Sequence, residues 1–208
     1  MEKSNRILTT IREMFPDASC ELNYNNIFEL LIAVVLSAQT TDKRVNIVTK
    51  ELFRKYPDAI SLGNAEYKDV YEVIKSLGLA KTKTSNIINL SRTLVEKYQS
   101  NVPNTKEQLE SLPGVGRKTA NAVLMEGFRI PAIAVDTHVS RVSNRLGLSN
   151  SDNVKIIEQD LMKTYDEKDW YFVHHGLLFF GRYFCLSQNP KCSECFLYDL
   201  CKAKDKRV

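Results

Sequence analysis

Four of the five cysteines in this 208-residue sequence crowd into one short stretch near the C-terminus, in the pattern C-x6-C-x2-C-x5-C. Cys20 stands alone, far from the others. An odd number of cysteines does not suit a framework of paired disulfides, and this density does not suit free structural cysteines. We therefore expect the four thiolates to bind a metal centre that closes the C-terminal segment into a compact loop. The ligands would be Cys185, Cys192, Cys195 and Cys201.

The spacing of these cysteines bears on the metal. Structural zinc sites usually have two C-x2-C-type pairs separated by a longer stretch, whereas here only Cys192 and Cys195 form such a pair. Four thiolates this close together favour a [4Fe–4S] cluster, with zinc as the chemical alternative. In either case the metal centre would stabilise a tail that has little apolar periodicity.

Most of the remaining sequence has the apolar spacing of α-helices, which predicts an all-α protein of about ten short helices. Residues 27–38 are apolar on nearly every face, the pattern of a buried central helix. We expect Gly78 to be the C′ glycine of a helix over 67–77, and the strand-like segment 130–135 to be a linker. The other expected helices cover residues 4–15, 42–54, 84–98, 116–126, 137–146, 153–164 and 168–184, with a short one after Thr105.

Composition and charge limit the classes of protein to which this chain can belong. Hydrophobic residues make up 43% and charged residues 26% of the chain, which excludes a largely disordered protein. No apolar run is long enough for a membrane span, and the N-terminus is charged and amphipathic, so we expect a cytoplasmic protein with no membrane partner. The net charge of +4 says little alone. Between Lys97 and Arg145, however, seven Lys/Arg face four Asp/Glu, which modestly supports binding to nucleic acid.

The segment LESLPGVGRKTA, residues 109–120, predicts a tight turn between two helices. Gly114 and Gly116 lie two apart, where they let the chain turn and expose N–H groups beside a new helix N-terminus. Such a turn is a ready site for a phosphate. A P-loop is excluded, because Arg117 separates Gly116 from Lys118 and no strand precedes the turn. A helix–helix turn without a ligand is the plain alternative.

Lys118 is the candidate nucleophile. It lies in the first turn of the new helix, where the helix dipole disfavours positive charge, and Arg117 adds like-charge repulsion. Burial against the helix over 27–38 would lower its pKa further from about 10.4. A partly neutral lysine can attack a sugar C1′ and form a Schiff base. The alternative is a solvated lysine that contacts a phosphate.

Asp136 is the candidate carboxylate. It precedes the expected helix over 137–146 as an N-cap, which is a structural role that needs no chemistry. Held close to the hairpin, it could stabilise the oxocarbenium-like charge that develops when a glycosidic bond breaks. It could also assist proton transfers to and from the lysine.

Together with the cysteine pattern, the segments LLIAVVLSAQTTD, LESLPGVGRKTANAVL and AVDTHVSRVSNRLG resemble, in this order, the endonuclease III family of bifunctional DNA glycosylase/AP lyases. The resemblance covers essentially the whole chain. It implies a two-domain helix-hairpin-helix glycosylase fold, with duplex DNA bound in the cleft between the domains. A six-helix domain over 21–131 would contain the hairpin at about 105–126, and residues 1–20 with 132–208 would form the iron–sulfur domain.

The resemblance also implies roles for single residues. Lys118 would be the nucleophile and Asp136 the essential carboxylate. Gln39 matches the residue that fills the gap left by the extruded base, and Leu79 matches a wedge on the opposite strand. Their plain alternatives are a polar residue at a helix end and a core leucine. The full set expected to contact DNA is Gly114, Gly116, Arg117, Thr119, Gln39, Leu79 and Lys191.

The implied activity is removal of oxidised pyrimidines from duplex DNA, followed by β-elimination 3′ to the abasic site, by a monomer. One departure is visible: the loop from Cys185 to Cys192 is often richer in basic residues and here has only Lys191, so we expect a weaker phosphate grip. One alternative is a non-catalytic DNA-binding protein with a metal-stapled tail. Another is a monofunctional adenine-mispair glycosylase, which Lys118 and the chain's end at Val208 disfavour.

Overall fold

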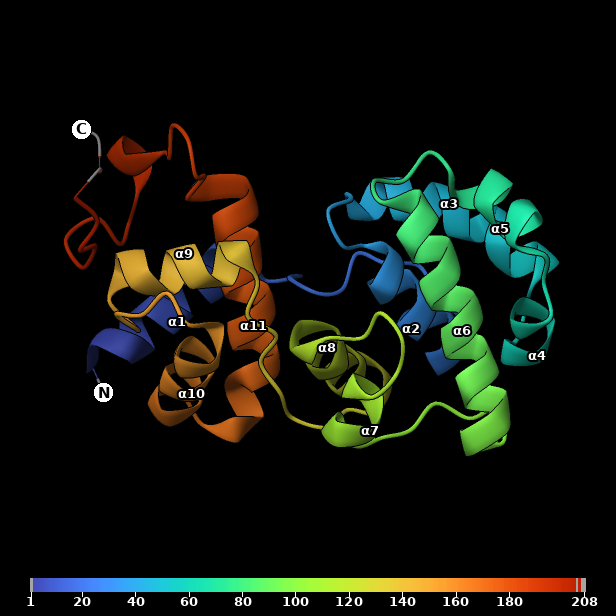
Figure 1. The fold of residues 1–208 in the computed structure, drawn as a ribbon. Helices are drawn as coiled ribbons and strands as arrows, with labels where there is room; N and C mark the ends of the chain where they lie inside the picture. Colours follow the sequence, from blue (N-terminus) through green and yellow to red (C-terminus); the bar gives the residue numbers. More distant parts are fainter. Residues whose placement is uncertain (1, 205, 207–208) are drawn as a thin grey trace. The chain divides into compact units, whose positions relative to one another are not determined.

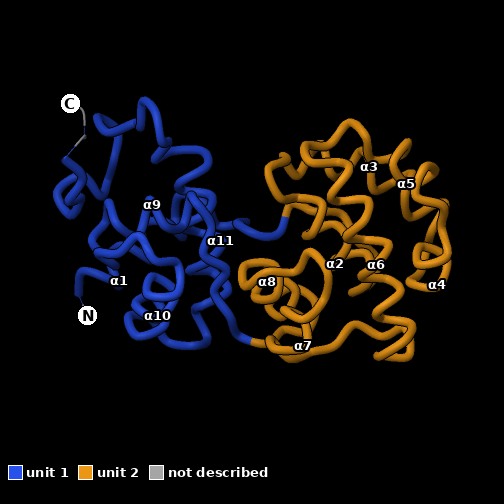
Figure 2. The backbone as a smooth tube through the Cα atoms, in the orientation of Figure 1, with its two compact units in different colours: residues 1–20, 131–208 blue, residues 21–130 orange. Residues whose placement is uncertain are grey.

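The computed structural model describes residues 2–204 and residue 206, and within them the chain is helical with no strand (Figure 1). The expected all-α fold is therefore confirmed. The chain divides into two compact units, residues 1–20 with 131–208 (unit 1) and residues 21–130 (unit 2), coloured separately in Figure 2. These units differ from the expected domain boundaries only at Pro131, which belongs to unit 1. That each unit acts as a functional domain stays a prediction.

Unit 2 is built around α2, whose side chains are buried along nearly its whole length because almost every residue is apolar. Asn26 caps the start of α2 by accepting a hydrogen bond from the backbone of Glu29. Helices α3, α6 and α8 pack against α2. The helices of this unit are α2 (Ile27–Leu36), α3 (Asp42–Lys55), α4 (Ala59–Gly63), α5 (Tyr67–Ile74), α6 (Ala80–Tyr98), α7 (Lys106–Glu110) and α8 (Arg117–Gly127).

Unit 1 combines the N-terminal helix α1 with helices that follow Pro131. Ile7 and Ile11 of α1 enter a core that also contains Phe180, and α1 packs against α11. Burying apolar side chains from segments so far apart in sequence stabilises the unit. Its elements are α1 (Glu2–Met14), α9 (Thr137–Leu146), α10 (Val154–Thr164), η1 (Glu167–Asp169), α11 (Trp170–Phe179), η2 (Phe180–Phe184) and η3 (Cys192–Glu194).

Three local expectations were wrong. Gly78 is not a left-handed C′ glycine: α5 ends at Ile74, and the left-handed conformation belongs to Leu79, with φ 59°. Consequently α6 starts at Ala80, before its apolar stripe begins. The helix expected over 168–184 is a 3-10 turn, then α11, then a π-helical turn. The segment 130–135 has no strand, which confirms the linker expected there.

The short helix α4 was not expected. Its five residues are too few to show an apolar repeat, and it is held by a reciprocal capping box between Asp58 and Ser61. Unit 2 therefore has seven α-helices where the resemblance implied six. Among the described residues, no helix combines the length and the apolar character needed to cross a membrane.

Candidate functional site

The glycine-containing turn expected from the sequence joins α7 to α8, which lie side by side (Figure 1). Leu112 and Val115 anchor the turn because their side chains are buried, and the Val115 amide donates a hydrogen bond to the Leu112 carbonyl at 3.1 Å. Gly114 has φ 78°, and Gly116 is the extended N-cap of α8 with φ −102°. The backbone hydrogen bonds of an α-helix do not use its first amides, which makes the start of α8 a candidate site for anions.

The two glycines have different physical roles. A Cβ atom on Gly114 would lie 2.8 Å from the Asn86 side chain, and its positive φ disfavours any other residue. A Cβ atom on Gly116 would meet nothing within 4 Å, and its backbone angles suit any residue. Glycine at position 114 therefore stabilises the turn, whereas a side chain at position 116 would meet no protein atom.

Lys118 lies in the first turn of α8 and its side chain is exposed. The expected burial of Lys118 against α2 was therefore wrong. The reason is the register of α8, which buries Ala120, Val123 and Leu124 instead. The side chains of Arg117 and Thr119 are half-buried, and both residues lie on the same first turn as Lys118.

The fold of unit 2 brings Gln39 and Leu79 close together. Their separation of 40 positions in the sequence does not indicate this proximity. Both side chains are exposed, and Leu79 is 55% exposed, so the core-leucine alternative was wrong. Both residues have left-handed backbones, with φ 54° and 59°. Their loops touch, because a Cβ atom on Gly78 would lie 3.2 Å from the Gln39 carbonyl oxygen. Left-handed non-glycine residues are uncommon and costly, and often mark functional loops.

Lys83, which the sequence analysis missed, lies directly beneath these loops. It is only 3% exposed, and its Nζ donates a hydrogen bond to Thr40 Oγ1 at 2.9 Å. Burial lowers the pKa of this amine. The available signal was its register, since Lys83 occupies the stripe of α6 that also buries Ile87 and Leu94.

Asp136 caps the N-terminus of α9 as expected. One carboxylate oxygen accepts hydrogen bonds from the backbone amides of His138 at 2.9 Å and Val139 at 2.8 Å, and the residue is half-buried. Asp136 belongs to unit 1 and Lys118 to unit 2. That the carboxylate works beside the hairpin stays a prediction.

The four cysteines of the C-terminal pattern line one cavity in unit 1. The cavity walls also include the aromatic rings of Phe180, Phe184 and Tyr198. Burial raises the pKa of the Cys185 and Cys195 thiols, so a bound cationic centre would be needed to hold them as thiolates. No set of three or more His, Cys, Asp or Glu side chains in the described residues is arranged for a single metal ion. A shared cavity lined by four sulfur ligands fits an iron–sulfur cluster.

Arginines of α9 hold the start of the segment over residues 185–201, here named the cluster loop. Arg145 donates to Cys185 Sγ at 3.4 Å and to the Leu186 carbonyl at 2.7 Å. Arg141 donates to the Gly181 carbonyl at 2.7 Å and to the Cys185 carbonyl at 3.1 Å. Hydrogen bonds to a ligand sulfur and its neighbouring backbone orient a metal ligand and tune the metal centre. No local pattern in the sequence indicates these contacts.

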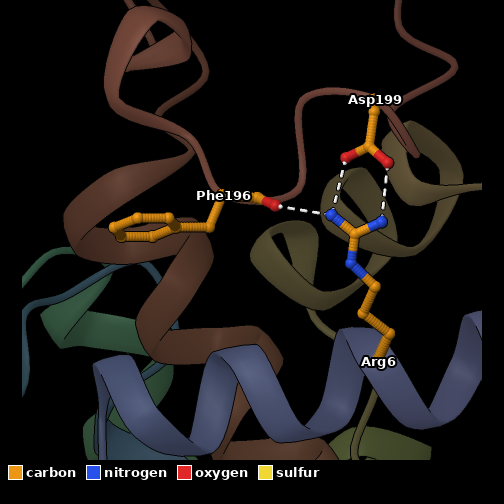
Figure 3. Close-up of polar contacts among 3 residues, drawn as sticks. All are labelled: Arg6, Phe196 and Asp199. Atoms are coloured by element: carbon orange, nitrogen blue, oxygen red, sulfur yellow. Dashed lines mark hydrogen bonds and ion pairs between the residues drawn. The ribbon is translucent and has the colours of Figure 1, made fainter.

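Arg6 of α1 holds the far part of the cluster loop (Figure 3). Its guanidinium donates two hydrogen bonds to the Asp199 carboxylate, at 2.6 and 3.0 Å, and a third to the Phe196 carbonyl at 3.3 Å. The paired hydrogen bond from Arg6 lowers the pKa of Asp199. The exposed Lys191 lies with its Nζ 5.8 Å from the centre of the Phe184 ring, at the edge of the same loop.

Two protein families match the chain. Residues 32–167 match the family described as HhH-GPD superfamily base excision DNA repair protein. Residues 185–201 match the family described as iron-sulfur binding domain of endonuclease III, and this second match begins and ends on a cysteine of the cluster loop.

Similar proteins are found by sequence and by structure. The chain is 49% identical to endonuclease III of Bacillus subtilis (strain 168), covering 96% of this chain and 92% of that protein. It is 43% identical to endonuclease III of Escherichia coli (strain K12), covering 99% of both. A solved structure of endonuclease III trapped as a covalent intermediate with DNA superposes with a TM-score of 0.92 at 48% identity, covering 95% of this chain and 93% of that one.

Proposed function

The chain belongs to the endonuclease III family of bifunctional DNA glycosylase/AP lyases, and from this we propose that it removes oxidised pyrimidines from duplex DNA and cuts the strand at the resulting abasic site. The observation that carries the proposal is the exposed Lys118 on the first turn of α8, directly after the glycine turn. The two alternatives are a non-catalytic DNA-binding protein and an adenine-mispair glycosylase. Neither would need an exposed lysine at this position.

The hairpin would hold the DNA backbone. The amides that open α8 can donate to a phosphate, and the open space at Gly116 lets the phosphate approach the backbone closely. Arg117, Thr119 and Lys191 would add contacts to neighbouring phosphates. These phosphate contacts do not depend on the base sequence. This independence suits an enzyme that must find damage anywhere in a genome.

Extruding the damaged base would be the work of Gln39 and Leu79. Taking a nucleotide out of the stack costs a few kcal/mol, and least for a damaged base. An exposed leucine can separate neighbouring bases as an apolar wedge. Gln39 would fill the space that the base leaves, where its amide can pair with the edge of the orphaned base.

The chemistry would proceed through a Schiff base. Lys118 Nζ attacks C1′ as the glycosidic bond breaks, and the base leaves with the bonding electrons and takes up a proton. Asp136 would stabilise the positive charge that develops on the sugar and would accept and return protons. The sugar ring opens to an imine. Loss of a proton from C2′ then expels the 3′ phosphate by β-elimination, and water releases the lysine.

The cluster loop would hold a [4Fe–4S] cluster through Cys185, Cys192, Cys195 and Cys201. Its contribution would be to keep the loop folded and Lys191 in place. No step of the proposed reaction passes through it. We further propose that the protein acts as a monomer in the cytoplasm, bound to DNA. Light scattering of the free protein tests the monomer, and a dimer would overturn it.

Lys118→Gln and Asp136→Asn test the proposed roles. Lys118→Gln should abolish strand cleavage on a duplex that contains one abasic site, while its affinity for that duplex stays within a few-fold. Asp136→Asn should slow base removal by more than a hundredfold, the range expected when electrostatic stabilisation of a transition state is lost. Lys163→Gln, which removes an exposed lysine from the end of α10, is the control and should cleave normally. Full cleavage by Lys118→Gln would overturn the proposal.

A further inference from the structure

A buried ammonium group lies under the two loops that carry Gln39 and Leu79. Lys83 is 3% exposed, and its amine bonds to Thr40 Oγ1 at 2.9 Å. In the part of the chain that the structure describes, no carboxylate pairs with Lys83, and burial is the cause of its lowered pKa. Burying a charge without a counter-ion is costly, so this lysine does not stabilise the core as an apolar residue would.

On one side, Lys83 holds the loop that follows α2. The Thr40 hydroxyl accepts from Lys83 Nζ and itself lies 3.4 Å from the Ala38 carbonyl oxygen, to which it can donate. The Thr40 amide donates to the Ser37 carbonyl at 3.0 Å. Gln39 lies between Ala38 and Thr40, so this chain of hydrogen bonds fixes both neighbours of a residue with a left-handed backbone.

On the other side, Lys83 holds the start of α6. Its backbone amide donates to the Leu79 carbonyl at 3.0 Å, which closes the first turn of the helix behind the second left-handed residue. Between the two loops, a Cβ atom on Gly78 would lie 3.2 Å from the Gln39 carbonyl oxygen, which is closer than an ordinary contact. One residue therefore binds Gln39's loop through its side chain and Leu79 through its main chain.

We propose that Lys83 and Thr40 are positioning residues for base extrusion, which hold Gln39 and Leu79 as one rigid pair. This inference rests on the proposed function, since it assumes that the two exposed side chains enter the duplex. If the pair is rigid, both side chains enter the duplex together. Base extrusion then avoids the entropic cost of ordering two separate loops. If the pair is loosened, base removal should become slower. Strand cleavage at a site that is already abasic should keep its rate.

The test uses the full-length protein with its cluster and two isosteric changes. Lys83→Met removes the ammonium and Thr40→Val removes the hydroxyl, each with little change in size. Each should slow single-turnover release of an oxidised pyrimidine by roughly tenfold, the factor that about 1.4 kcal/mol represents. Cleavage of a preformed abasic duplex should stay within twofold. Fluorescence of 2-aminopurine beside the lesion, which rises when bases unstack, should rise less on binding.

Matched variants separate positioning from general stability. Thr49→Val makes the same change at a buried threonine that bonds only within α3 and should leave every readout unchanged. Thr40→Ser keeps the hydroxyl and should restore base release. The double variant Lys83→Met/Thr40→Val should be no slower than the slower single variant, because both remove the same hydrogen bond.

Three results would overturn this inference. The first is base release by both single variants within twofold of the unchanged protein. The second is an equal loss of base release and abasic cleavage, which indicates a structural role. The third is additive effects in the double variant. Failure of the proposed function would look different, because the unchanged protein would then release no base and cut no abasic site. Should Lys83→Met not fold, Thr40→Val alone decides the question.

Discussion

Replacing the two hairpin glycines by alanine, one at a time, should separate folding from DNA binding. Gly114→Ala places a Cβ at a position with φ 78°, only 2.8 Å from the Asn86 side chain. The left-handed backbone alone costs about 1–2 kcal/mol for a residue with a Cβ, before the displacement of Asn86. For a protein of this size, that energy lowers the melting temperature by roughly 2–8 °C.

Gly116→Ala should have the opposite effects. Its Cβ meets no protein atom within 4 Å. The loss of glycine at an N-cap and the reduced entropy of the unfolded chain are both below about 1 kcal/mol and oppose each other. Stability should therefore change by less than about 0.5 kcal/mol. A methyl group at this position would keep a phosphate from the α8 amides. Losing one hydrogen bond to a charged group costs about 1.5–3 kcal/mol, which is a roughly 10- to 150-fold weaker affinity.

The assay is thermal unfolding of both variants, together with their affinity for a duplex with a non-cleavable abasic analogue at one fixed salt concentration. Gly114→Ala should melt earlier, and the folded fraction should still bind. Gly116→Ala should melt normally and bind weakly. If Gly116→Ala binds as tightly as the unchanged protein, the phosphate does not approach the hairpin at this glycine, and the reasoning is refuted.

Three further predictions concern unit 1. Cys195→Ser should lower the bound iron and the absorbance near about 400 nm that iron–sulfur clusters give; unchanged iron content would contradict the cluster assignment. Burial raises the pKa of Tyr165, so its contribution to stability is complete below the unfolded pKa of about 10 and is lost as the pH rises above it. Tyr165→Phe should therefore lose less unfolding free energy than the unchanged protein between pH 9 and 11, and identical losses would contradict this. Arg6→Met should speed proteolysis within the loop that includes Phe196 and Asp199, since it removes all three hydrogen bonds of Figure 3; unchanged cleavage would show that the loop does not need them.

The sequence predicts best where the local signals agree. The helix expected over 137–146 is α9 with the same bounds, because Asp136 caps its start and the left-handed Gly147 ends it. The buried helix expected to begin at residue 27 is likewise found as α2, which starts at Ile27 and has nearly all its side chains buried. In both cases, patterns within a few residues decide the structure.

Prediction fails where the decisive partner lies far along the chain. Leu79 takes the left-handed conformation expected of Gly78, and nothing in a leucine signals that. The contacts of Arg6 with Asp199 span 193 positions. Lys83 resembles a surface lysine until the loop that follows α2 is placed against it. In all three, tertiary packing overrides local propensity.

Locating the covalent bond to DNA tests the central claim most directly. The protein would be mixed with a duplex that contains one abasic site, reduced with borohydride, digested, and the DNA-linked peptide identified by mass spectrometry. We predict one adduct, on the amine of Lys118, which lies on the exposed first turn of α8. An adduct on another lysine, or none while the strand is still cut, would contradict the account.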